Sequence, residues 1–335
     1  MKEASFYKDL GDKTVRCELC PHYCKLADGE TGICRVRTNH NGVLMSDNYG
    51  KICSLRFDPI EKKPLYNFHP GDQILSVGSV GCNLACKFCQ NWEISQTGVA
   101  EYPYLKETTP EEIVGMASGH AENAGIAYTY NEPTVWYEFM LDIARMAKEK
   151  GLYNVMVSNG FINMDPLDEL NKYMDAYNID FKAFNDKFYN EVAGARLKPV
   201  LKTIEAIKKA GKHLELTNLV ITDLNDDPAE FTEMVQWIRE NTGKDTPLHI
   251  SRYFPVYKLN IESTSVRTLQ RFYEIATEHL SYVYLGNTHT SNGSNTLCPG
   301  CGKLVIERSG YSTYKTGLDK EGNCRECGRN VIEFI

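Results

Sequence analysis

Three cysteines, Cys82, Cys86 and Cys89, form a C-x3-C-x2-C arrangement within residues 81–91. This spacing gives one short loop three thiolates, one fewer than a closed four-coordinate site requires. Cysteine thiolates at short spacings hold iron–sulfur clusters. A [4Fe–4S] cluster with only three protein ligands keeps one iron free to bind and activate a small molecule. The alternative interpretation is three buried or zinc-bound thiols.

A second group of cysteines lies near the other end of the sequence. Cys298, Cys301, Cys324 and Cys327 form two C-x2-C pairs separated by a hairpin-like stretch. Clustered pairs of this kind in a reducing compartment indicate a metal site and not disulfides. Four thiolates in this pattern predict a zinc ribbon, with rubredoxin-like iron less favoured.

A third group lies near the beginning of the chain. Cys17, Cys20, Cys24 and Cys34 also offer four thiolates, which fit either zinc or an auxiliary [4Fe–4S] cluster. We favour structural zinc, because nothing nearby indicates an electron-transfer partner. Cys53 stands alone and receives no role, since a lone cysteine is most often a small buried hydrophobic residue.

The overall composition excludes several classes of protein. The chain has 335 residues, 42% of them hydrophobic, and a net charge of −7. Binding of nucleic acid over a broad surface requires a basic face, so we expect no nucleic-acid partner for this acidic chain. No stretch approaches the ~18 consecutive apolar residues of a membrane helix. The charged first residues lack the apolar core of a secretory signal, so we expect a soluble, cytoplasmic protein with no membrane partner.

Apolar runs and helical stretches alternate between the cysteine groups, which indicates βαβ units around a parallel sheet. We therefore predict an α/β fold: a partial (β/α)6 TIM-like barrel over 73–289, an N-terminal four-cysteine module over 1–72 and a C-terminal zinc-ribbon-like module over 290–335. In such a barrel, chemistry belongs at the carboxyl ends of the strands. The predicted strands are 74–80, 126–130, 154–158, 177–181, 214–221, 248–254 and 282–285. One predicted helix begins at Pro110, and the others cover 135–150, 166–174, 199–210, 229–241 and 266–279.

The cysteine loop directly follows the first predicted strand, and its sequence resembles a known family. Residues 81–91, with the strand ends downstream, are similar to the pyruvate formate-lyase activating enzyme group of the radical S-adenosylmethionine (SAM) superfamily. More narrowly, 58–66, 89–95, 128–134 and 249–255 resemble the radical SAM enzyme of the AmmeMemoRadiSam system. The resemblance implies a partial barrel, a [4Fe–4S] cluster at Cys82, Cys86 and Cys89, and SAM bound to the open iron.

The chemistry implied by this resemblance is reductive cleavage of SAM to a 5′-deoxyadenosyl radical, which abstracts hydrogen from a substrate. The implied partners are SAM, an electron donor such as flavodoxin or ferredoxin, and an unidentified substrate that is a small molecule or a protein. Activation of a glycyl-radical enzyme is an alternative. If the chain is not an enzyme, the alternative is a multi-metal electron carrier or a zinc-ribbon adaptor protein.

The resemblance also implies which residues contact SAM. Phe88 belongs to the cluster motif. Tyr130, Asn131 and Glu132 stand where the superfamily has Gly-Gly-Glu, so Glu132 is expected to accept hydrogen bonds from the methionine ammonium. The alternative role for Glu132 is an acid at a helix N-terminus.

Two further strand ends match the pattern. Ser158 and Asn159 are expected to contact the ribose, and Asp180 and Lys182 resemble the family's Asp-Leu-Lys, with Lys182 facing the SAM carboxylate. Alternate residues of a strand share a face, so Asp180 and Lys182 can reach the barrel mouth together. A turn at Asn159 and a solvated pair at Asp180 and Lys182 are the structural alternatives.

His249 and Arg252, on the predicted strand 248–254, are the candidates for catalytic residues. An imidazole and a guanidinium at a barrel rim can bind an anionic substrate or the SAM carboxylate. A structural histidine on a strand is the alternative.

Overall fold

The structure is a computed structural model that describes residues 1–288 and 293–335. Its centre is an eight-stranded sheet in which β9 and the strands β11 to β16 run parallel in chain order, and β8 joins one edge antiparallel. The two edge strands, β8 and β16, do not pair with each other, so the barrel is open. The strands are β8 (Ser54–Pro59), β9 (Gln73–Gly78), β11 (Asn123–Tyr128), β12 (Tyr153–Ser158), β13 (Ala176–Asp180), β14 (His213–Val220), β15 (Leu248–Arg252) and β16 (Val283–Gly286).

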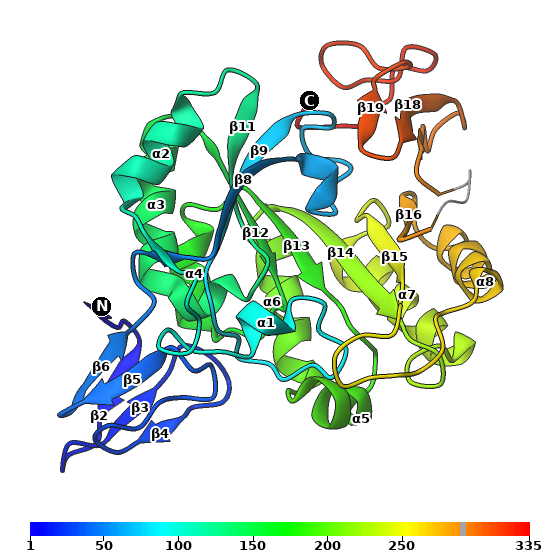
Figure 1. The fold of residues 1–335 in the computed structure, drawn as a ribbon. Helices are drawn as coiled ribbons and strands as arrows, with labels where there is room; N and C mark the ends of the chain where they lie inside the picture. The colour runs from blue at the N-terminus through cyan, green and yellow to red at the C-terminus, as the bar shows by residue number, and fades with distance from the viewer. Residues whose placement is uncertain (289–292) are drawn as a thin grey trace.

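Helices connect successive parallel strands and pack against the sheet (Figure 1). Polar residues fix where several of them begin: Thr109 forms a capping box with Glu112, and Asp227 and Ser265 accept hydrogen bonds from first-turn amides. The helices are α2 (Pro110–Ser118), α3 (Tyr137–Glu149), α4 (Met164–Asn171), α6 (Leu197–Lys209), α7 (Pro228–Thr242) and α8 (Val266–Thr277). The predicted partial barrel is confirmed.

The N-terminal residues form small sheets at the end of the barrel where the parallel strands finish. These sheets pair β1 (Lys2–Glu3), β5 (Arg37–His40) and β6 (Val43–Ser46), then β2 (Tyr7–Asp9), β3 (Val15–Cys17) and β4 (Lys25–Leu26). β7 (Lys51–Ile52) pairs with β10 (Lys106–Glu107). Arg37 joins the module to α3 through a buried ion pair, with its two terminal nitrogens each 3.0 Å from a carboxylate oxygen of Glu138.

The opposite end of the barrel, where the strands begin, is closed by residues 60–70 and the end of the chain. The 3₁₀ helix η1 (Ile60–Lys62) opens this segment, and Phe68 belongs to a buried cluster with strand-start residues such as Ile74 and Ala176. Phe334 lies against Phe68, and the His69 amide donates to the Phe334 carbonyl.

The C-terminal strands β17 (Thr296–Leu297), β18 (Leu304–Ser309) and β19 (Ser312–Tyr314) form a separate small sheet. Figure 1 shows β18 and β19 far from the short helix α1 (Trp92–Ser95) and from the N-terminal module. The predicted boundary at residues 289 and 290 lies outside the described residues. Within the described chain, no helix combines the length and apolarity required to cross a bilayer.

Candidate functional site

The cysteine loop leaves β9 at the carboxyl end of the sheet, where a barrel presents its chemistry. Gly81 opens the loop with φ +90°, and a side chain there would approach the Cys34 carbonyl to 2.6 Å. Only glycine fits this backbone and this contact. The loop is then held by hydrogen bonds from the Ala85 and Lys87 amides to the carbonyls of Ala193 and Val192, in the π-helix η3 (Tyr189–Ala193).

The three thiols of the loop lie in a charged, largely buried environment. Burial raises the pKa of Cys82, and the carboxylate of Glu132 raises it further. Burial raises the pKa of Cys86 to about 11, opposed by the ammonium of Lys182. The Asn159 side-chain amide donates to the Cys82 sulfur at 3.7 Å. Glu132, Lys182 and Asn159 are therefore brought to the cysteine loop from three different strand ends.

Glu132 lies just after β11 and is 3% exposed. Its Oε1 accepts from the Thr134 amide (3.1 Å), the Thr134 hydroxyl (2.6 Å) and the Ser158 hydroxyl (2.8 Å), and its Oε2 accepts from the Asn159 amide (2.8 Å). Burial raises the pKa of Glu132, and only uncharged donors oppose the shift. No lysine, arginine or histidine of the described chain forms an ion pair with it. Because Oε2 accepts from a single donor among the described residues, it has room for another.

Tyr130 adopts φ +74°, a conformation that glycine adopts freely and other residues rarely do. Its side chain folds away from the cysteine loop, packs on Gly78, and donates its hydroxyl proton to Asp58. Its carbonyl accepts from the Asn91 side chain at 2.8 Å. The backbone shape of the missing glycine is thus retained, at a cost of about 1–2 kcal/mol.

Asn131, Ser158 and Asn159 make contacts within the protein. Asn131 bridges the start of the cysteine loop, accepting from the Ser79 amide and donating to the Gly81 carbonyl. Ser158 donates to Glu132, and the Asn159 side chain donates to Asn83 Oδ1 at 2.9 Å. The structure places all three beside the loop as its supports, and their predicted contacts with SAM stay predictions.

Asp180 ends β13, and Lys182 follows it at the same rim. The Lys182 ammonium lies 3.0 Å from Asp180 Oδ2 and 5.6 Å from the centre of the Phe88 ring. Burial acts to lower the pKa of Lys182, but the negative charge of Asp180 opposes it and the pKa is raised above its ordinary value. Phe88 is buried against Phe188. The ammonium and the thiols therefore share one small region.

His249 and Arg252 lie at different ends of β15. His249 is the second residue of the strand and donates to Glu215 Oε2 at 2.6 Å, inside a network at the closed end of the barrel. Arg252 is the last residue, and its Nε donates to the Thr264 carbonyl at 2.7 Å. The structure brings Arg252, but not His249, to the end of the sheet that carries the cysteine loop.

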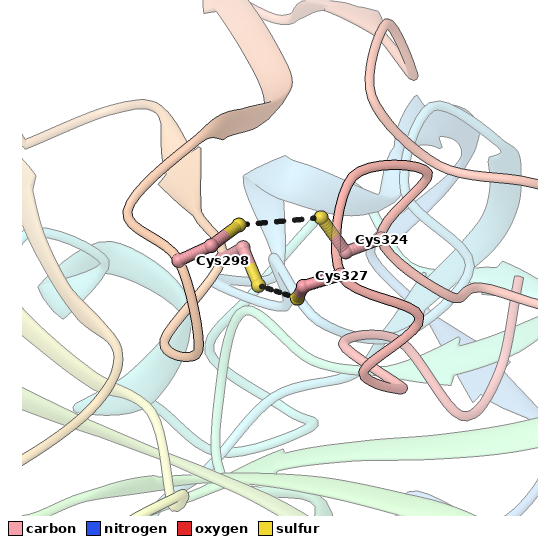
Figure 2. A group of neighbouring side chains, drawn as sticks. Cys298, Cys324 and Cys327 are labelled. Atoms are coloured by element: carbon pink, nitrogen blue, oxygen red, sulfur yellow. Dashed lines mark hydrogen bonds between the residues drawn. The ribbon is translucent and has the colours of Figure 1, made fainter.

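The C-terminal cysteines form a compact group. Cys298, Cys301, Cys324 and Cys327 have sulfurs that all lie within 4.8 Å of one another. Two of these distances are 3.5 and 3.7 Å, and Figure 2 shows the sulfurs facing each other. A tetrahedral ion with zinc–sulfur bonds of about 2.3 Å separates its sulfurs by about 3.8 Å. The geometry therefore fits one tetrahedral metal ion.

The N-terminal cysteines, Cys17, Cys20, Cys24 and Cys34, line a single cavity together with Asn83, the residue after Cys82. Asn83 was missed by the sequence reasoning, although it lies inside the cysteine motif. Its carbonyl accepts from His22 Nε2 at 2.7 Å, and its side chain donates to the Phe161 carbonyl. The network of Glu215 with His213 and His249 was also missed. His213 lies on the same strand as Glu215, but His249 reaches it from β15, and a contact between strands leaves no local signal in the sequence.

Comparison with known proteins agrees with this geometry. Residues 76–238 match the model of the Radical SAM superfamily. The chain is 46% identical over 334 residues to the uncharacterized protein MJ0808 of Methanocaldococcus jannaschii, covering 99% of each chain. It is 22% identical over 162 residues to the pyruvate formate-lyase 1-activating enzyme of Escherichia coli, covering 48% of this chain and 66% of that one.

Among solved structures, Streptococcus suis SuiB bound to S-adenosylmethionine has a TM-score of 0.52 at 16% identity, over 69% of this chain and 53% of that one. A match at this identity shows a shared fold. The family model begins within β9 and ends within α7, so it includes the cysteine loop. Residues 76–238 of the chain therefore belong to the radical SAM superfamily.

Proposed function

We propose that this radical SAM enzyme cleaves S-adenosylmethionine reductively at a [4Fe–4S] cluster on Cys82, Cys86 and Cys89, and then removes hydrogen from a small-molecule or protein substrate. When bound, the cluster and SAM supply an electron and a carbon-centred radical, chemistry that no side chain provides. The residues of the loop fit the cluster, because the loop carries three thiols and no fourth cysteine belongs to it.

The observation that carries the proposal is the Glu132 carboxylate. It is buried beside Cys82 and lacks a cationic partner in the described chain. A buried charge is costly unless it is paired. An ammonium group of a ligand at the cysteine loop would supply the missing pair, and the methionine part of SAM carries one.

The other residues of the rim have complementary tasks. Lys182 offers its ammonium to the SAM carboxylate, and Asp180 keeps that ammonium charged and in place. Asn159 donates to the Cys82 sulfur, which stabilises the thiolate. Thr134 and Ser158 fix the Glu132 carboxylate, so that it is oriented before the ligand arrives.

Activation of a glycyl-radical enzyme is the second candidate. Its support is the similarity to the E. coli chain named as an activating enzyme, which covers 48% of this chain.

The test is anaerobic reconstitution with iron and sulfide, followed by dithionite and SAM, with 5′-deoxyadenosine as the product measured. We expect product from the wild-type chain and from Cys53→Ala, a matched control whose thiol donates to the Ser79 carbonyl outside the loop. Cys86→Ala should lose both the cluster and the product. A wild-type chain that holds an intact cluster and SAM but releases no 5′-deoxyadenosine would refute the proposal.

A further inference from the structure

The four N-terminal cysteines face one another across a common cavity, but they are not gathered round one point. Cys17, Cys20, Cys24 and Cys34 all line this cavity. Among the described residues, which include all four, no three of their sulfurs fall within the 4.8 Å of one another that the C-terminal group meets. The same is true of Cys82, Cys86 and Cys89.

This spacing separates two kinds of metal centre. A single tetrahedral ion holds its sulfurs about 3.8 Å apart. In a [4Fe–4S] cluster each thiolate binds a different iron at a corner of the cube, so the sulfurs stand farther apart and enclose a space. The C-terminal ribbon is the internal reference, since the same structure draws its four sulfurs together. The N-terminal cysteines follow the wider arrangement.

The cavity is also lined by a cationic side chain, which suits an anionic metal centre. Arg37 lines it and is 2% exposed. Its terminal nitrogens are used by Glu138 and the Ser5 carbonyl, but its Nε has no hydrogen-bond partner among the described residues. A buried donor left without a partner costs about 1–3 kcal/mol. Ligand sulfur in the cavity would give this part of the guanidinium an acceptor.

The cavity lies directly beside the loop of Cys82. Asn83 lines it and is covalently joined to Cys82, and His22 on the other side donates to the Asn83 carbonyl at 2.7 Å. The Cys34 carbonyl lies against Gly81. A metal centre at the N-terminal site is therefore separated from the Cys82 loop by little more than one residue.

We propose that Cys17, Cys20, Cys24 and Cys34 hold a second [4Fe–4S] cluster, in place of the structural zinc that the sequence favoured. All four of its irons have protein ligands, so this cluster exchanges electrons and binds no substrate. Its position suits electron exchange with the centre held by the Cys82 loop. The inference concerns only the N-terminal site and does not depend on the proposed reaction.

The decisive experiment removes the other iron site and leaves the N-terminal module intact. The full-length triple variant Cys82→Ala, Cys86→Ala and Cys89→Ala is reconstituted anaerobically, and iron, acid-labile sulfide and zinc are measured per chain. We expect about four irons and about four sulfides, with an electron paramagnetic resonance signal after reduction by dithionite. Zinc should amount to about one ion per chain, from the C-terminal ribbon.

Two outcomes overturn the proposal: about two zinc ions with no sulfide, or iron without sulfide. A second full-length variant, Cys20→Ala with Cys24→Ala, keeps the Cys82 loop and should fall from about eight irons to about four. Cys53→Ala is the matched control and should keep them all. Because the triple variant has no SAM cluster, its iron content is independent of whether the chain cleaves SAM.

Discussion

Replacing Glu132 by glutamine tests the proposed SAM site most directly. The side chain keeps its size but loses its charge, and one carboxylate oxygen becomes an amide nitrogen. In the native chain, Oε1 accepts from Thr134 and Ser158, and Oε2 accepts from the Asn159 amide. Either orientation of the new amide turns one of its N–H groups toward a backbone N–H, of Asn159 or of Thr134.

Two effects with different readouts follow. The unsatisfied donors should lower the free energy of unfolding by about 1–3 kcal/mol, partly offset because a buried charge is removed. The lost charge should also weaken the binding of SAM. A hydrogen bond to a charged group contributes about 1.5–3 kcal/mol, which corresponds to about 10- to 150-fold in the dissociation constant.

The affinity of the reconstituted chain for SAM is measured anaerobically by equilibrium dialysis, beside a denaturant unfolding curve. Thr134→Val is the matched control, because it removes one donor to Glu132 and leaves the carboxylate charged. We expect this control to lose about 1 kcal/mol of stability but to bind SAM within about threefold of wild type. If Glu132→Gln also binds SAM within threefold, the carboxylate does not meet the ammonium and the argument fails.

The assignment of Glu132 also predicts the direction in which SAM affinity and stability change with pH. Burial raises the pKa of Glu132, so the ionised form is present only above a value higher than the ordinary 4.5. SAM affinity should therefore fall as the pH is lowered through that raised pKa, and the fall should be absent in Glu132→Gln. For the SAM-free chain the sign is opposite: burying the charge costs stability as the pH rises from 4.5 through the raised pKa. Equal pH profiles for variant and wild type would contradict the assignment.

Four other substitutions test separate parts of the structure. Lys182→Gln should weaken SAM binding about 10-fold or more, measured in the same dialysis, because it removes a charge-assisted donor. Tyr130→Gly should be about 1 kcal/mol more stable than Tyr130→Ala in denaturant unfolding, because both lose the ring but only glycine relaxes at φ +74°. Burial acts to raise the pKa of Glu215, but His213 and His249 counteract it and lower the pKa to about 2. Glu215→Gln should therefore lower the free energy of unfolding by about 3 kcal/mol at pH 7. This loss of stability should shrink as the pH falls from 4.5 toward 2. Cys301→Ala should lose the ribbon's metal ion and lower the melting temperature, while 5′-deoxyadenosine formed per cluster stays unchanged.

The strands and helices of the barrel could be predicted because their signals are local. Buried parallel strands appear as short apolar runs, and Thr109 with Pro110 marks the start of α2. Helix α3 was also predicted, although its expected first turn is the 3₁₀ helix η2 (Pro133–Trp136). The edge strand β8 was not predicted, because its half-buried residues acquire their role only by pairing with β9.

The sequence predicted which residues belong to the site better than it predicted the contacts that these residues make. The motif located Glu132 and Lys182 at the strand ends, but nothing in the sequence shows that Glu132 would have no cationic partner among the residues that the structure describes. Tyr130 breaks the local rule that a residue at positive φ is glycine, and its ring is retained by Asp58, 72 positions earlier in the chain. For His249, alternation along the strand indicates a face, but the partner that holds it, Glu215, comes from another strand.

The two accessory modules lie at opposite ends of the barrel, and this placement decides what each can influence. The ribbon docks where the strands begin: Arg308 donates to the Tyr66 carbonyl at 2.7 Å, and Thr313 donates to Glu61 at 2.7 Å. The N-terminal module docks where the strands end, with Cys34 against Gly81. A change in the ribbon's metal must cross the whole sheet to reach the cysteine loop, whereas a change at the N-terminal cysteines acts through one residue. Loss of the ribbon's metal should therefore reduce stability, and loss of the N-terminal centre should alter the chemistry of the loop itself.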